Sequence, residues 1–172
     1  MAISTQTILD VVRPVCPGVE TYEHHNQLTL IIPMSDIVEV CRELRDNSLT
    51  QFTMLIDITA IDWNRKSHRF ELVYFLQSMA IGGRVRLKVA VDDYHLHAPT
   101  MTGIWESANW YERETFDMYG IKFDGHPDLR RFYMPEDFAD PKNAEPLFPL
   151  RKDFPLMGIP GSMPLPPMPE KI

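Results

Sequence analysis

Basic residues and long apolar runs are both scarce in this chain of 172 residues. It carries 17 lysines and arginines against 24 aspartates and glutamates, for a formal net charge of −7. Binding to nucleic acid or to anionic lipid needs a basic face, so this balance argues against a nucleic-acid partner and against direct docking on a membrane. No apolar run approaches the roughly 18 to 20 residues that span a bilayer, so any membrane association is expected to be indirect.

Cysteine and targeting signals are also sparse. The two cysteines, Cys16 and Cys41, lie far apart in the sequence, whereas an ordinary iron–sulfur cluster needs four thiolates. We therefore expect no cofactor and no metal in this chain. Residues 1–10 lack both a basic segment followed by an apolar one and an Arg-rich transit pattern, so we expect the chain to stay in the compartment where it is made.

Apolar residues make up 44% of the chain, enough for a real core, and their spacing predicts a domain over residues 1–126. The predicted elements are helices over residues 8–15 and 34–46, and strands over 28–32, 52–59, 70–77 and 85–91. Apolar residues on both sides of the 52–59 strand suggest that it is central, and Gly82-Gly83 predicts a hairpin before the last strand. Two further short helical pieces are expected over residues 100–119, with Asn109 as the cap of the second. The order predicts an α+β fold: a mixed β-sheet with helices packed on one face.

Residues 127–172 form a second region with a different composition. Eleven of the fifteen prolines fall here, and proline is incompatible with a helix interior or a central strand. The region nevertheless keeps apolar anchors such as Phe132, Tyr133, Phe148 and Phe154, which a solvated tail would lack. We therefore predict an extended proline-rich C-terminal arm that docks on another protein, at least through its second half, with folding back onto its own domain as the alternative.

The densest cluster of charged residues lies within residues 109–131, and three hypotheses compete for it. A carboxylate metal site is disfavoured because Glu112 and Glu114 are two residues apart and point in different directions on a helix. Acid–base catalysis by Glu114, Asp117 or His126 lacks an accompanying nucleophile or oxyanion element. The third hypothesis is an internal ion-pair network. Arg113 and Asp117 share a helical face, and Arg130 and Arg131 could return to these carboxylates and so fix the start of the arm.

The same segment resembles the signature of the 30 kDa subunit family of complex I, known in bacteria as the C subunit of NADH–quinone oxidoreductase. The blocks that carry the resemblance are Trp110-Tyr111-Glu112-Arg113-Glu114, Asp117-Met118-Tyr119-Gly120-Ile121, His126-Pro127-Asp128-Leu129-Arg130-Arg131, Met134-Pro135-Glu136-Asp137 and Pro149-Leu150-Arg151-Lys152-Asp153-Phe154-Pro155-Leu156. They stand in the family's order over residues 105–156. Arg130, often Lys in the family, and Phe132, often aliphatic, are mild departures.

The resemblance implies a structural subunit without a redox centre, in the peripheral arm of a proton-translocating NADH (or ferredoxin):quinone oxidoreductase. Such a complex uses iron–sulfur clusters, quinone and NADH or ferredoxin, and lies on the cytoplasmic face of the bacterial inner membrane. The expected partners are other peripheral-arm subunits, chiefly the large quinone-site subunit and the subunit with the terminal iron–sulfur cluster. By the same resemblance, the subunit-interface residues are Glu112, Arg113, Glu114, Asp117, His126, Arg130, Arg131, Arg151, Lys152, Asp153 and Phe154.

Three alternatives stay open. Within the same class, the chain could be the homologous subunit of a membrane-bound hydrogenase, which looks similar. From another class, it could be a free-standing acid–base or metal enzyme that uses the Glu/Asp/His cluster. A soluble adaptor is the third alternative, although the arm lacks the basic pattern usual for proline-rich ligands.

Overall fold

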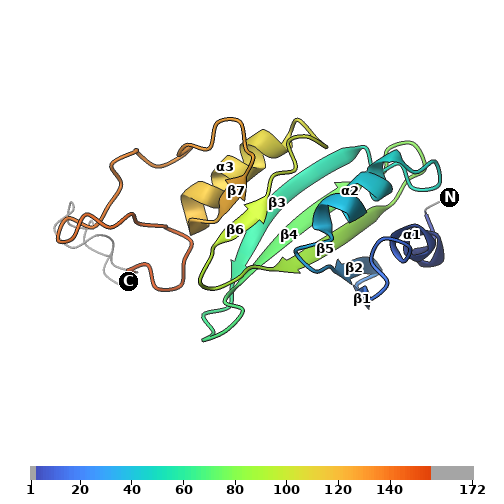
Figure 1. The fold of residues 1–172 in the computed structure, drawn as a ribbon, viewed down its shortest axis with the longest axis horizontal. Helices are drawn as coiled ribbons and strands as arrows, with labels where there is room; N and C mark the ends of the chain where they lie inside the picture. Colours follow the sequence, from blue (N-terminus) through green and yellow to red (C-terminus); the bar gives the residue numbers. More distant parts are fainter. Residues whose placement is uncertain (1–2, 156–172) are drawn as a thin grey trace, which may run out of the picture.

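The computed structural model describes residues 3–155, which form an α+β fold with a mixed sheet (Figure 1). The elements in chain order are α1 (Thr5–Val12), β1 (Glu20–His24), β2 (Gln27–Ile31), α2 (Ile37–Asp46), β3 (Met54–Asp62), β4 (Phe70–Gln77), β5 (Arg84–Ala90), β6 (His97–Pro99), α3 (Ala108–Tyr119) and β7 (Lys122–Asp124). The main sheet has the strand order β1-β2-β5-β4-β3, and β6 pairs with β7 separately. In the main sheet, β2 and β5 run parallel and the other neighbours run antiparallel, so the sheet is mixed, as predicted.

The core lies between one face of the sheet and helices α1 and α2. Both helices bury apolar stripes at helical spacing, including Ile8 and Val12 in α1 and Ile37, Val40 and Cys41 in α2. These stripes pack against alternate residues of the strands, and together they form one continuous hydrophobic cluster. Burial of Cys41 on the apolar face of α2 confirms the prediction for that thiol.

Strand β3 lies at the edge of the sheet, so the prediction that it is central was wrong. Its apolar second face has a different cause. Helix α3 and the turn before it cover the outer edge of β3, and two side chains donate to carbonyls on this side of the chain. The Thr115 hydroxyl donates to the Ile58 carbonyl at 2.9 Å, and the Trp105 indole donates to the Phe52 carbonyl at 3.2 Å. An edge that is covered in this way is protected from pairing with another chain.

Two further differences from the sequence expectations concern local structure. Strand β1 was not predicted, because all five of its residues are exposed and carry no apolar alternation. Helix α3 starts at Ala108 after Ser107, so Asn109 lies inside the helix and is not its cap. The preceding residues 102–104 form a turn, not a separate helix.

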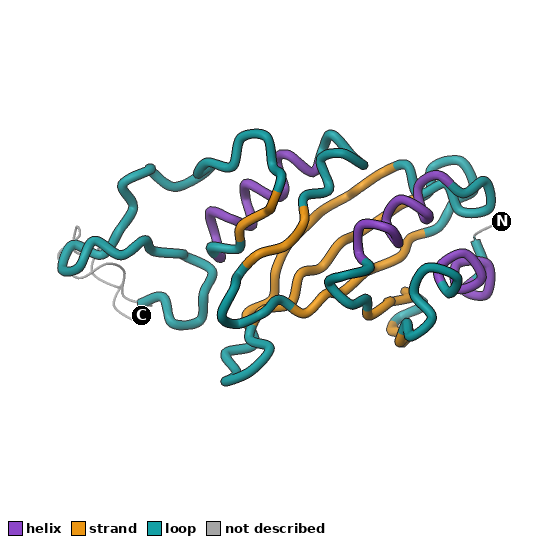
Figure 2. Tube along the Cα trace, viewed as in Figure 1, coloured by secondary structure: helices purple, strands orange, loops and turns teal. Residues whose placement is uncertain are grey.

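Residues 127–155, which we name the strap, follow β7 as a long loop (Figure 2). The strap leaves the domain near α3, turns at a bridge between Ala139 and Pro146, and returns to the C-terminal end of α3. The described part of the predicted arm therefore contacts its own domain. Most of the arm's second half, residues 156–172, lies outside the described residues. Among residues 3–155, no helix combines the length and the apolar character needed to cross a bilayer.

Candidate functional site

Helix α3 carries an unusual row of buried polar side chains. Glu112, Arg113, Thr115 and Asp117 are all buried, whereas Trp110 on the same helix is 52% exposed. Buried charges are costly unless they are paired or hydrogen-bonded. The partners of these side chains therefore show what the helix is built to hold.

Asp117 holds the start of the strap through its carboxylate. Oδ1 accepts a hydrogen bond from Arg131 at 2.8 Å, and Oδ2 accepts from the main-chain N–H groups of Phe132, Tyr133 and Met134 at 2.6–3.1 Å. Burial alone would raise the pKa of Asp117, but these donors outweigh it and lower the pKa below its usual range. Because Asp117 stays ionised, it fixes three consecutive backbone amides of a segment that has no helix or strand to pair with.

Arg113 holds the same segment through its carbonyl groups. Its guanidinium donates to the carbonyls of Arg130 and Arg131 at 3.3 and 3.2 Å. It also lies over the rings of Trp110 and Phe132, at 5.3 and 5.2 Å from their centroids. The arginine therefore supports an aromatic patch, Trp110, Phe132 and Tyr133, whose members are 40–57% exposed and contact one another in sequence.

Arg131 joins the outgoing and returning halves of the strap. In addition to its ion pair with Asp117, its guanidinium donates to the carbonyls of Phe138 and Leu147 and lies over the ring of Phe148. The structure therefore contains a charged network between α3 and the start of the arm, as the third hypothesis predicted. Its wiring differs from the expectation, because Asp117 pairs with Arg131 and Arg113 binds carbonyls instead of Asp117.

A second anchor holds the end of the strap. Asp62, at the end of β3, accepts two hydrogen bonds from Arg69 and one from the main-chain N–H of Lys152, and Arg69 also pairs with Asp153 at 2.9 Å. Burial alone would raise the pKa of Asp62, but Arg69 and the backbone donors lower it to about 2. Arg151 completes the anchor by donating to the Tyr119 carbonyl at 2.6 Å.

Asp62 and Arg69 were missed from the sequence, although a signal was present. Ile58, Ala60 and Asp62 alternate on one side of β3, which places a carboxylate on the side that faces the core. A buried carboxylate predicts a cationic partner. Gly120 was likewise missed as a structural residue. It ends α3 with a φ of 77°, and a Cβ there would lie 2.5 Å from the Arg151 guanidinium and 2.6 Å from the Phe148 ring.

Glu112 points away from the strap and holds the turn before α3. Its carboxylate accepts from the Met101 N–H at 2.5 Å and from the Thr100 hydroxyl at 2.6 Å, and no cation within residues 3–155 is paired with it. Burial raises the pKa of Glu112 to about 7, against the lowering effect of these two donors. The same interior holds the Tyr74 hydroxyl, which has no hydrogen-bond partner among the described residues.

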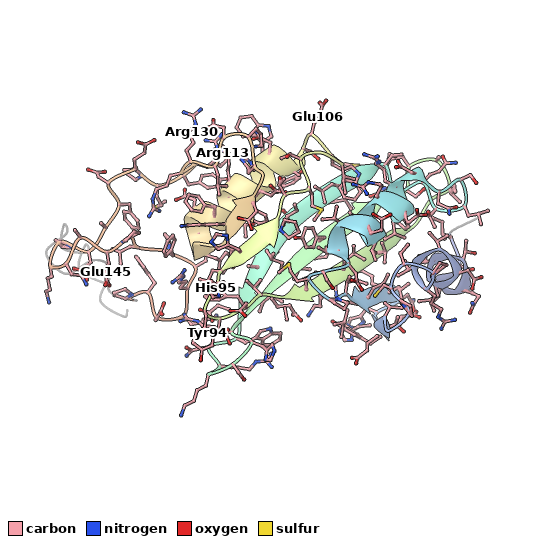
Figure 3. All side chains as sticks on the ribbon, viewed as in Figure 1. Tyr94, His95, Glu106, Arg113, Arg130 and Glu145 are labelled. Carbon is pink, nitrogen blue, oxygen red and sulfur yellow. The ribbon has the colours of Figure 1, made fainter. Side chains whose placement is uncertain are left out.

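The remaining predicted site residues lie outside these contacts. Burial raises the pKa of Glu114, and the nearby carboxylate of Asp57 raises it further. His126 is held by the Asn109 carbonyl and the Asp128 N–H, while Arg130 pairs with Asp128 at the surface. Figure 3 shows Arg113 and Arg130 on the α3 side of the molecule, far from Tyr94 and His95. Phe154 stacks on Phe138 within the strap. In the part of the chain that the structure describes, no three His, Cys, Asp or Glu side chains are grouped to hold a metal ion.

The fold and the site define a class of protein: an α+β module whose buried charges hold an extended C-terminal segment. The family model described as "Respiratory-chain NADH dehydrogenase, 30 Kd subunit" matches residues 30–160, and the chain belongs to this family. The second C-type subunit of NADH-quinone oxidoreductase of Rhizobium meliloti (strain 1021) is 46% identical, over 78% of this chain and 69% of that protein. The chain covers 64% of the corresponding Rhizobium etli (strain CIAT 652) protein, so these relatives are longer. The C-type subunit of NADH-quinone oxidoreductase of Roseiflexus sp. (strain RS-1) is 40% identical over 91% of this chain and 87% of its own.

Two solved structures share the fold. A trypsin-resistant fragment of Nqo5 is 31% identical, with a TM-score of 0.62 over 72% of this chain and 98% of the fragment. A chain from the membrane-bound sulfane sulfur reductase, an archaeal respiratory membrane complex, is 26% identical, with a TM-score of 0.70 over 88% of this chain and 86% of its own. The second match covers a larger share of this chain than the first.

Proposed function

We propose that this chain is a structural subunit in the peripheral arm of a proton-translocating quinone oxidoreductase of the complex I type, and that it takes no part in electron transfer itself. Membership of the 30 kDa subunit family and relatives named as subunits of NADH-quinone oxidoreductase support the proposal. The complex would carry the iron–sulfur clusters, the quinone and the NADH or ferredoxin site in other subunits. The chain would lie on the cytoplasmic face of the membrane through these partners.

The observation that carries the proposal is the way the strap is held. Its anchors are charged side chains that bind main-chain groups, and they leave the aromatic patch turned outward. Exposed aromatic side chains grouped on a held backbone are typical of the centre of a protein–protein contact. Tyr133 and Trp110, both more than half exposed, are the residues that we expect a neighbouring subunit to cover.

The predicted interface residues then divide into two roles. Arg113, Asp117, Arg131, Arg151, Lys152 and Asp153 would position the strap, and Phe154 would pack inside it. Glu112, Glu114, His126 and Arg130 would shape the domain surface next to it. We propose residue 127 as the start of the docking arm, with the large quinone-site subunit as its main partner and the subunit with the terminal iron–sulfur cluster beside it.

The similarity to a chain of an archaeal sulfane sulfur reductase supports a wider class, which includes the hydrogenase alternative. The electron donor and acceptor would then be decided by other subunits. A free-standing enzyme is less well supported. Glu112 has the pKa of a general base, but its side chain is fully buried and lines none of the main pockets of residues 3–155.

Purification of the full chain through an affinity tag, from its native membranes in mild detergent, tests the proposal. The double variant W110S/Y133S is expected to fold normally but to lose at least about tenfold of the co-purified quinone-site subunit, since buried aromatic anchors contribute about 2 kcal/mol or more each. Tyr94→Ser is the matched control, because Tyr94 is 93% exposed and lies away from the strap (Figure 3). Full recovery of the partner with the double variant would contradict the proposal.

A further inference from the structure

The main sheet has a second face, which neither α1 nor α2 covers. Cross-strand register places one row of side chains on this face across all five strands: Tyr22, Thr29, Arg86, Phe75 and Asp57. These residues alternate with the core residues of the same strands, such as Leu30, Leu87 and Tyr74, which face the helices. We name this surface the open face.

The open face is cationic along β5 in a chain that is acidic overall. Arg84, Arg86 and Lys88 alternate along this strand on the same side. Lys88 pairs with Glu71 at 2.7 Å, but Arg84 and Arg86 have no carboxylate partner within residues 3–155. Arg84 donates to Gln77 and Arg86 donates to Gln27, so each guanidinium meets a neutral amide.

Two buried polar atoms on this row have no hydrogen-bond partner among the described residues. One is the Arg86 Nε, and the other is the hydroxyl oxygen of its cross-strand neighbour Thr29. A buried polar atom without a partner costs about 1 to 3 kcal/mol, and such groups are rare in native proteins. Two of them side by side, next to a guanidinium that meets only a neutral amide, indicate a surface that is completed by another molecule.

A pocket of about 160 Å³ opens beside these atoms. It is lined by Arg84 and Arg86 together with the apolar side chains of Leu28, Ile56 and Phe75. The Arg86 guanidinium lies over the Phe75 ring at 5.1 Å, which fixes its orientation toward the pocket wall. At one end of this face, Met54 pairs with Gln77 across the strands and is 45% exposed.

We propose that the open face binds an acidic segment of a second subunit, in which a carboxylate lies next to an apolar side chain. The carboxylate would accept from Arg84 and Arg86, and the apolar side chain would fill the pocket. Charge complementarity favours this occupant, because two arginines that meet only neutral amides lie over an apolar floor. The inference rests on the proposed function, since the partner belongs to the same assembly, but it places a contact on a different surface from the aromatic patch.

Photo-crosslinking in the assembled complex tests this inference. The photoreactive residue p-benzoylphenylalanine replaces Met54 on the open face, Tyr133 in the aromatic patch, or Tyr94 as a remote control, each in the full chain. We expect the probe at position 54 to label another subunit, at a segment with Asp or Glu next to an apolar residue. Arg86→Gln should lower the yield of this product about tenfold, as expected for the loss of a buried charge pair.

Matched variants separate the effect of the pair from misfolding and from net charge. Arg86→Lys keeps the cation and should retain most of the product, and Arg13→Gln removes the same charge from the end of α1 without effect. Replacing the labelled carboxylate by Lys, together with Arg86→Glu, should restore the yield. The inference is overturned if position 54 yields no intersubunit product while position 133 does. Labelling only of residues 156–172 of the same chain, a labelled segment without a carboxylate, or indifference to Arg86→Gln would overturn it too. Absence of products at both positions would overturn the proposed function as well.

Discussion

The carboxylate of Glu112 makes the stability of this chain depend on pH near neutrality. Its side chain is fully buried and accepts two hydrogen bonds, but it has no cationic partner among the described residues. The folded pKa is about 7, against 4.5 for the free side chain. For an acid with a raised pKa, the folded state holds the proton more tightly than the unfolded state. The stabilising effect is therefore complete below pH 4.5 and is lost as the pH rises through 7.

The magnitude follows from the interval between the two pKa values. From 4.5 to about 7, that interval corresponds to about 3 kcal/mol of unfolding free energy. The variant Glu112→Gln mimics the protonated acid, because its amide oxygen can still accept from the Met101 N–H. We expect the variant to match the natural chain within about 1 kcal/mol at about pH 5 and to exceed its stability by about 2 to 3 kcal/mol at about pH 8.

Urea unfolding of both full-length chains, at several pH values from about 5 to 8, measures this difference. Subtraction removes the contributions of the histidines and the other acids, which both chains share. Glu106→Gln is the matched control, since Glu106 is exposed at the surface before α3 (Figure 3). A difference between Glu112→Gln and the natural chain that stays constant over this pH range would refute the reasoning.

Three further predictions concern the strap. Asp117→Ala should lower the unfolding free energy by about 3 to 5 kcal/mol in urea titrations, because it leaves the buried Arg131 guanidinium without its counter-charge, whereas Asp128→Asn at the exposed pair with Arg130 should change it by less than about 1 kcal/mol. Gly120→Ala should lower the midpoint of thermal unfolding and speed proteolysis within residues 127–155, because its Cβ would displace Phe148 and Arg151; Gly103→Ala, which meets nothing within 4 Å, is the control, and equal effects would contradict the role of Gly120. The end of the strap should detach in acid: the pKa of Asp62 is lowered from 3.8 to about 2, so its contribution is complete above the higher value and is lost as the pH falls through the lower one, and protection of the Lys152 amide from hydrogen exchange should follow this curve.

The predictability of this structure depended on how locally each feature is encoded. Strand β4 begins and ends at the predicted residues, Phe70 and Gln77, because its apolar run is bounded by polar turns. Helix α2 was predicted from its apolar stripe, and it starts three residues later than expected. Strand β1 left no such signal, since it pairs with β2 through its backbone while every side chain is exposed.

The wiring of the charged network was less predictable, because its contacts are distant in sequence. Spacing alone favoured Arg113 as the partner of Asp117, one helical turn away. The chain returns at residues 131–134 with a guanidinium and three free N–H groups, and together they satisfy more of the carboxylate than one side chain on the same helix could. Which residues were buried could be inferred from composition. Which residues paired depended on the path of the strap, and periodicity carries no information about that path.

The charged anchors have a consequence for assembly. A strap without helix or strand would ordinarily lose much of its conformational freedom on binding, at a cost of about 0.5 to 1.5 kcal/mol for each ordered side chain. Here Asp117 and Arg113 already hold the backbone on both sides of Phe132, and Arg113 lies over the rings of Trp110 and Phe132. Most of the ordering is therefore complete before a partner arrives. The buried charges on α3 act on binding through this preorganisation, so substitutions at Asp117 should weaken assembly even though the side chain itself is out of a partner's reach.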